Sequence, residues 1–230
     1  MHFDPLYFVF VLPAFLLGLW AQWRIRAAYG QAQQLAAPLS GAAAARHILD
    51  SAGLQEVPVE QTPGHLSDHY DPRAKALRLS PEVYQSRSLA AVGIAAHEAG
   101  HALQDAHGYA PLVIRNAAVP AANLGSSAGM ILIVLGAMLQ MNATLIWLGI
   151  GLFSCVVVFQ LVNLPVEFNA SSRAKAQLVS LGVVNQDELH YVNKVLGAAA
   201  LTYVAATLQA LLTLLYYVVR FGGASSSDRE

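Results

Sequence analysis

The residues with the clearest capacity for chemistry form the segment His97-Glu98-Ala99-Gly100-His101, which follows the pattern H-E-x-x-H. Residues four apart lie on one face of an α-helix, so His97 and His101 can direct their imidazoles to a single zinc ion. Glu98, one position further round, then lies beside the metal as a general base rather than a ligand. A pattern with three fixed letters also arises by chance on a helix that merely carries two histidines. The rest of the chain therefore has to decide between these interpretations.

A hydrolytic zinc usually takes three protein ligands and keeps one position for water, and two residues are candidates for the third. His107 has the metzincin spacing H-E-x-x-H-x-x-G-x-x-H, but Gln104 replaces the glycine, and a continuing helix would turn His107 away. Glu167 follows two long apolar runs and is the only acidic residue between Asp105 and Asp187. It could equally be a solvated carboxylate at a helix start, where the helix dipole favours it. The residues alone leave both interpretations of Glu167 open.

The composition is that of a membrane protein. Hydrophobic residues make up 56% of the chain and charged residues 12%, whereas charged residues reach roughly 25% in soluble domains. The formal net charge of -1 argues against a nucleic-acid partner, which would require a basic face. The single cysteine, Cys155, excludes an intrachain disulfide, and any metal site must use histidine and carboxylate ligands.

Four apolar runs are long enough to cross a bilayer, and they divide the chain. The second and third are separated by three residues only and predict a tight transmembrane hairpin. The predicted segments are a first transmembrane helix at 1–23, a catalytic region with the H-E-x-x-H helix at 24–116, a transmembrane hairpin at 117–162, a segment with Glu167 at 163–194, a fourth transmembrane helix at 195–221 and a disordered tail at 222–230.

The distribution of basic residues predicts the orientation. Of the 13 lysines and arginines, 11 lie in segments 24–116 and 163–194. The positive-inside rule places these two segments in the cytoplasm and both termini on the other side. Because the transmembrane hairpin returns the chain to the face that it left, Glu167 can approach the motif helix.

The elements that must position the motif are predicted from caps and turn residues. The motif helix should span Leu89–Ala106, and only eight uncharged residues precede His97 in it, far fewer than the roughly 20 needed for a membrane span. This argues against an intramembrane protease. Lys75–Leu79 directly precedes this region and could be an edge strand on which a peptide adds. The other predicted elements are a helix at Gly41–Ala52, a strand at Glu56–Gln61 and a hairpin of Leu66–Tyr70 with Lys75–Leu79.

Several segments carry a resemblance to the YugP-like bacterial membrane zinc metallopeptidases and, more distantly, to the HtpX and CAAX-protease type. The matching segments are Ser67–Pro72, Leu77–Pro81, His97–Gln104, Pro165–Phe168 and Ala200–Ala206. The resemblance implies a gluzincin site in which His97, His101 and Glu167 hold Zn²⁺. The HtpX pattern has an aspartate four residues after the ligand glutamate, expected to hold a zinc histidine. Here that residue is Ser171, with Asn169 nearby; a hydroxyl can accept the imidazole N–H but brings no charge.

The resemblance and the composition together imply a mainly α, polytopic protein of the bacterial inner membrane, with four transmembrane helices and a small α+β zincin-like cytoplasmic domain. The implied activity is zinc-dependent hydrolysis of protein or peptide substrates, membrane proteins among them, with Glu98 as general base. The lipid bilayer is the other expected partner, and nothing indicates an oligomeric state. Five side chains are candidates for a donor to the developing oxyanion: Tyr70, Arg173, His190, Tyr191 and Tyr203.

Two other classes of function remain. A non-catalytic membrane scaffold could retain a structural or vestigial zinc site, but such a site has no need of Glu98. A transporter would carry charged residues within its spans. The second, third and fourth apolar runs contain none, so this interpretation ranks last.

Overall fold

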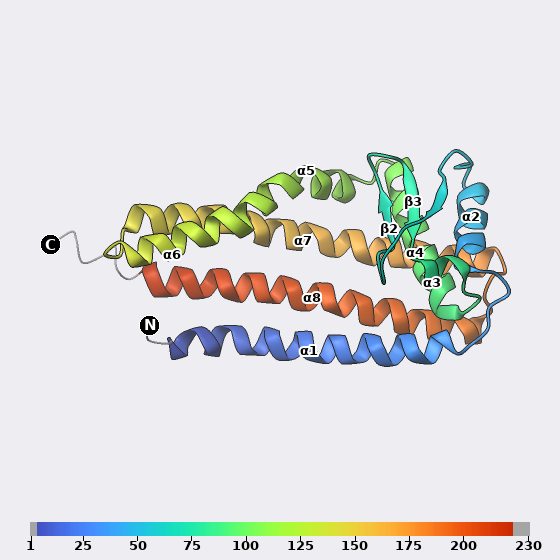
Figure 1. Ribbon diagram of the computed structural model, residues 1–230, viewed down its shortest axis with the longest axis horizontal. Coiled ribbons are helices and arrows are strands. Elements are labelled where there is room, and N and C mark those ends of the chain that lie inside the picture. The colour runs from blue at the N-terminus through green and yellow to red at the C-terminus, as the bar shows by residue number, and fades with distance from the viewer. Residues whose placement is uncertain (1–3, 223–230) are drawn as a thin grey trace. The chain divides into compact units, whose positions relative to one another are not determined.

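The computed structural model describes residues 4–222, and the structural statements below concern these residues. The chain is mainly helical with one small sheet, which confirms the expected fold class (Figure 1). The predicted tail at 222–230 lies, apart from Gly222, outside the described residues. The elements in order are α1 (Pro5–Gln33), α2 (Gly41–Ser51), β1 (Val59–Gln61), β2 (His69–Asp71), β3 (Ala76–Leu79), α3 (Pro81–Gln85), α4 (Leu89–Ala106), α5 (Ala110–Leu124), the π-helical turn η1 (Gly125–Gly129), α6 (Met130–Met138), α7 (Ala143–Ser180) and α8 (Gln186–Gly222).

Four helical stretches in the described part of the chain are long and apolar enough to cross a membrane, as predicted. They are Pro5–Gln33, Ala110–Met138, Ala143–Ser180 and Gln186–Gly222. All four are longer than the apolar runs that they contain. The helix at 143–180 continues past the predicted boundary at residue 162 because good helix formers such as alanine, lysine, arginine and glutamine follow it. Charged residues mark the end of the segment that can lie in the membrane, but the helix continues through them.

Glu167 consequently lies in the interior of α7, 24 residues after its first residue. The alternative interpretation, a solvated carboxylate at a helix start, is wrong. Its side chain is also buried, with 5% of the residue surface exposed.

The chain forms two compact units. The first comprises the described parts of Met1–Trp20, Ile114–Leu164 and Thr202–Glu230. Its helices pack closely through small residues: a Cβ added at Gly125 would lie 2.2 Å from the Leu152 carbonyl oxygen, and one at Gly149 would lie 2.6 Å from that of Gly129. Close approach through small residues is the usual basis of helix packing in lipid, where apolar burial gives no driving force between helices.

The second unit comprises Ala21–Val113 and Pro165–Leu201 and contains the sheet. The strand order is β1-β3-β2, with β1 parallel and β2 antiparallel to β3. The predicted hairpin of β2 and β3 is confirmed. The hypothesis that Lys75–Leu79 is a free edge is wrong, because Val59–Gln61 returns to pair with Leu77–Leu79 and makes β3 the central strand.

Helix α4 is the core of the second unit and has the predicted bounds. The Ser88 side chain caps it by accepting from the backbone N–H of Ala91 at 3.2 Å. The backbone N–H of Leu89 donates to the Leu35 carbonyl at 3.0 Å, which ties the start of α4 to the chain that leaves α1. Thirteen of its 18 residues are buried, against α2, α3 and the sheet among others. Figure 1 shows β2 and β3 beside α4. A helix packed in this way holds the two motif histidines in fixed positions.

Candidate metal centre

Three side chains that can bind a metal meet in the second unit: His97 and His101 from α4, and Glu167 from α7. The Glu167 Oε2 atom lies 3.2 Å from His97 Nε2 and 3.7 Å from His101 Nε2. One potential ligand atom from each residue lies within 4.8 Å of the other two. These are the three residues that the sequence resemblance implies as ligands.

The spacing of these atoms fits a zinc ion. Zinc binds imidazole nitrogen and carboxylate oxygen at about 2.0–2.1 Å with tetrahedral geometry, so neighbouring ligand atoms lie about 3.3 Å apart. The two nitrogen–oxygen distances lie on either side of this value. The chemistry of the donors fits as well, because two imidazoles and one carboxylate form the protein ligand set of a hydrolytic zinc site.

Gly100 lets the two helices approach closely enough to form this group. A Cβ at this position would lie 2.6 Å from the Ala170 carbonyl oxygen of α7, closer than any real Cβ contact. The glycine lies between the two histidines in sequence, and Ala170 is three residues from Glu167. The second variable position of H-E-x-x-H is therefore constrained here by packing against the helix that carries the carboxylate.

His97 is held by the residue that departs from the HtpX pattern. The Ser171 hydroxyl lies 3.1 Å from His97 Nδ1, the ring nitrogen opposite the one that faces Glu167. The hydroxyl is thus placed where the sequence analysis expected it to accept the imidazole N–H. With Nδ1 as donor, Nε2 keeps its lone pair for a metal.

His101 is held by Gln104, a residue that the sequence analysis missed. Gln104 is fully buried, and its Oε1 lies 3.0 Å from His101 Nδ1. Its Nε2 donates to the Val166 carbonyl at 2.8 Å and to Asn169 Oδ1 at 3.1 Å. Because both amide protons are used in this way, Oε1 is the acceptor and His101 Nδ1 is the donor. Gln104 therefore fixes the tautomer in which His101 Nε2 can bind a metal.

One signal in the sequence could have identified Gln104. It follows His101 by three residues on a helix, and side chains three apart are neighbours on the helix surface. In the sequence, Gln104 stands out only as the residue that replaces the metzincin glycine. Its second role requires Val166 and Asn169 of α7 as acceptors, and those pairings are visible only in three dimensions.

Glu98 is oriented by the sheet rather than by the helix. The backbone N–H of Tyr70 in β2 donates to Glu98 Oε2 at 3.1 Å. The Tyr70 hydroxyl donates to Asp105 Oδ2 at 2.7 Å, so both ends of Tyr70 are joined to α4. Two effects raise the pKa of the Tyr70 phenol above its usual value: burial, which is the larger, and the hydrogen bond to Asp105. The phenol therefore stays protonated at neutral pH.

The other candidates named from the sequence occupy different surroundings. His107 is exposed at the end of α4, its Nδ1 contacts the Leu103 carbonyl, and it is not part of the metal-binding group. Arg173 Nε donates to Asn169 Oδ1 at 2.8 Å, which connects it to the Gln104 network. The rings of His190 and Tyr191 pack edge to face at 5.6 Å. Tyr203 belongs to the first unit.

The electrostatics of the group favour a cation. Burial alone would lower the pKa of His101, but the nearby carboxylates of Glu167 and Glu98 outweigh burial and raise the pKa above its usual value. A raised pKa means that the surroundings stabilise positive charge on the ring. The same carboxylates would stabilise a metal ion bound at His101 Nε2.

Comparison with known proteins agrees with this geometry. The family model described as "Putative neutral zinc metallopeptidase" matches residues 7–222. The chain belongs to this family. It is also 48% identical over 217 residues to "Putative membrane protease YugP" of Bacillus subtilis (strain 168), an alignment that covers 93% of this chain and 96% of that relative. No solved structure gives a significant match to the chain. The family implies zinc as the metal, and His97, His101 and Glu167 form a group that could hold a metal ion.

Proposed function

We propose that this protein is an integral-membrane, zinc-dependent endopeptidase of the gluzincin type, with His97, His101 and Glu167 as zinc ligands. The observation that carries the proposal is the meeting of these three side chains at distances suited to zinc, with Glu98 adjacent on α4 and outside the ligand group. The family and the similarity to a membrane protease support the same activity.

The residues divide the chemistry between them. Zinc in this site would act as a Lewis acid that polarises the scissile carbonyl and acidifies a water molecule. Glu98 takes the proton of the attacking water and then delivers it to the leaving amine. The Tyr70 backbone N–H holds one Glu98 oxygen, Oε2, at 3.1 Å and leaves the other for proton transfer. Gln104 keeps His101 in the tautomer that binds metal, and the Ser171 hydroxyl lies where it can accept the N–H of His97 in the same tautomer.

Charge supports a cytoplasmic active site in a bacterial inner membrane. The zinc ligands lie in segments 24–116 and 163–194, which contain 11 of the 13 basic residues. Under the positive-inside rule these segments face the cytoplasm. The substrates that we propose are proteins or peptides on that side, membrane proteins among them, and not nucleic acids.

The second candidate function is a scaffold with a structural zinc site. Glu98 argues against it, because a structural site is closed by four protein ligands and needs no base. Three ligand side chains form the group found among residues 4–222, which leaves one position for water.

The proposal is tested by metal content and cleavage in the purified full-length protein. We expect close to one zinc per chain, casein cleavage that a chelator abolishes, and recovery of cleavage when zinc is added back. Zinc that is bound without any cleavage of casein or of a peptide library would favour the scaffold. Cleavage that is unaffected by a chelator while zinc is removed would contradict a zinc mechanism.

Gln104 gives a prediction that concerns metal affinity. Gln104→Leu keeps the volume of the side chain but removes the acceptor for His101 Nδ1 and should weaken zinc binding by about 10- to 100-fold, the usual effect of losing such a partner. Gln104→Glu keeps the acceptor for His101 Nδ1 but loses the donors to Val166 and Asn169, so an affinity above that of Gln104→Leu would identify the acceptor as the decisive group. Competition with a zinc indicator measures both. If Gln104→Leu binds zinc with wild-type affinity, Gln104 does not position His101.

A further inference from the structure

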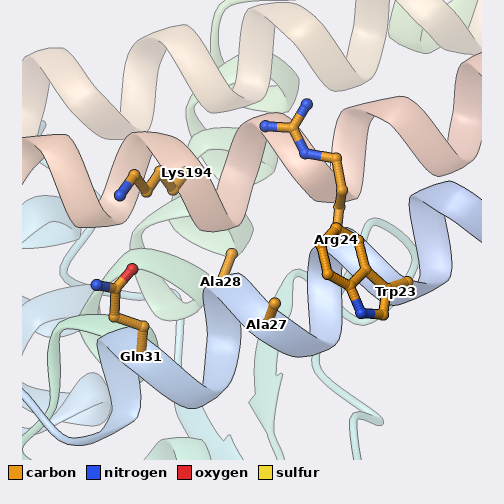
Figure 2. A pocket seen from close by; sticks show the side chains of 6 residues that line it. All are labelled: Trp23, Arg24, Ala27, Ala28, Gln31 and Lys194. Atoms are coloured by element: carbon orange, nitrogen blue, oxygen red, sulfur yellow. The ribbon is translucent and has the colours of Figure 1, made fainter.

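A second candidate site lies outside the metal centre, where α1 and α8 pack together in the second unit. A cavity of about 190 Å³ opens there. It is lined by Trp23, Arg24, Ala27, Ala28 and Gln31 of α1 and by Lys194 of α8, as Figure 2 shows. The volume is several times the roughly 30 Å³ of a water molecule, enough for a small polar group but not for a folded partner.

The chemistry of the lining fits an anion. Arg24 and Lys194 are cationic, Gln31 supplies an amide donor, and no carboxylate is among the six lining residues. Ala27 and Ala28 have short side chains that leave the space open between these donors. The Lys194 ammonium also lies 5.5 Å from the centre of the Tyr191 ring, an attractive contact that restricts where the charge lies.

The position of both cations along the chain identifies where that anion comes from. Arg24 follows the apolar run Pro5–Ala21 by three residues, and Lys194 directly precedes the apolar run Val195–Val219. Each cation thus lies where a helix leaves the hydrocarbon layer. The positive-inside rule places both cations on the cytoplasmic side of the membrane. Trp23 belongs to the aromatic residues that gather at the level of lipid headgroups. Phospholipid phosphates lie at that level.

We propose that this cavity binds the phosphate group of an anionic phospholipid. Basic pockets between transmembrane helices on the cytoplasmic side bind anionic lipid headgroups. Each lysine or arginine near the membrane surface adds electrostatic attraction to these lipids. The site is independent of the metal centre, so it can be tested whether or not the protein cleaves peptides.

The test measures lipid binding by the delipidated full-length protein in detergent, with native mass spectrometry counting bound phosphatidylglycerol and phosphatidylcholine. Wild type should prefer phosphatidylglycerol by about 30-fold, the combined effect of two interfacial cations. Arg24→Gln/Lys194→Gln should lose this preference. The matched control is Arg26→Gln/Lys175→Gln, which removes the same charge from positions outside the cavity lining and should keep it.

A second variant tests the cavity without changing charge. Ala27→Trp should fill the space and remove the preference, and Ala27 is exposed, so the fold should tolerate the larger side chain. Equal losses in the double variant and its matched control would show attraction to general positive charge and overturn the proposal. Retention of the preference in Ala27→Trp would also overturn it. Displacement of the lipid by an equal concentration of inorganic phosphate would assign the cavity to a free anion instead.

Discussion

Glu98→Gln is expected to lower kcat for peptide cleavage by about 100- to 10,000-fold, the range that a positioned general base contributes. Glutamine has almost the same shape as glutamate and its amide oxygen can still accept the Tyr70 N–H, which donates to Glu98 Oε2 at 3.1 Å in the wild type. It cannot take a proton from water at neutral pH. Glu98 is also outside the ligand group, so zinc content should stay close to one per chain.

The measurement pairs casein cleavage with zinc content in the same preparation. Glu56→Gln is a suitable control because Glu56 is exposed in the turn before β1. This substitution changes the net charge by the same amount as Glu98→Gln. Loss of both cleavage and zinc in Glu98→Gln would make Glu98 a structural residue. Wild-type cleavage in Glu98→Gln would remove it from the mechanism.

The sequence predicted most of the fold because its strongest signals are local. The four apolar runs and the turn between Asp71 and Lys75 each depend on neighbours in the chain. The bounds Leu89–Ala106 for α4 were predicted correctly for this reason. The ends of the membrane spans were less accurate, because hydropathy marks where the lipid ends and not where the helix ends, as the continuation of α7 to Ser180 shows.

The sheet and the surroundings of the metal centre depend on contacts between distant segments. Pairing of β1 with β3 joins residues 18 positions apart, and no local signal distinguishes a central strand from an edge strand. Gln104 holds His101 only because α7 presents the Val166 carbonyl and Asn169 beside it. The close approach at Gly100 and Ala170 is of the same kind. The sequence alone could name the residue types and not these pairings.

Glu167 is the residue on which sequence reasoning alone could not decide, and Glu167→Ala tests the geometry that resolves it. Removing this carboxylate leaves His97 and His101 with no third ligand from α7. We expect zinc affinity to fall by more than about 100-fold, because losing a ligand should cost more than losing a partner that only orients one. Cleavage should be lost at zinc concentrations that saturate the wild type, and addition of excess zinc should restore metal binding without full activity.

Thermal unfolding gives a second measurement that does not depend on cleavage. A ligand that binds only the folded state raises Tm in proportion to RT ln(1 + [L]/Kd), so zinc should raise Tm of the wild type strongly and Tm of Glu167→Ala weakly. His107→Ala is the matched control, since His107 is exposed and lies outside the ligand group. It should bind zinc as the wild type does. If Glu167→Ala keeps full affinity while His107→Ala loses it, the third ligand is His107, and the last turn of α4 must unwind to bring that side chain to the metal.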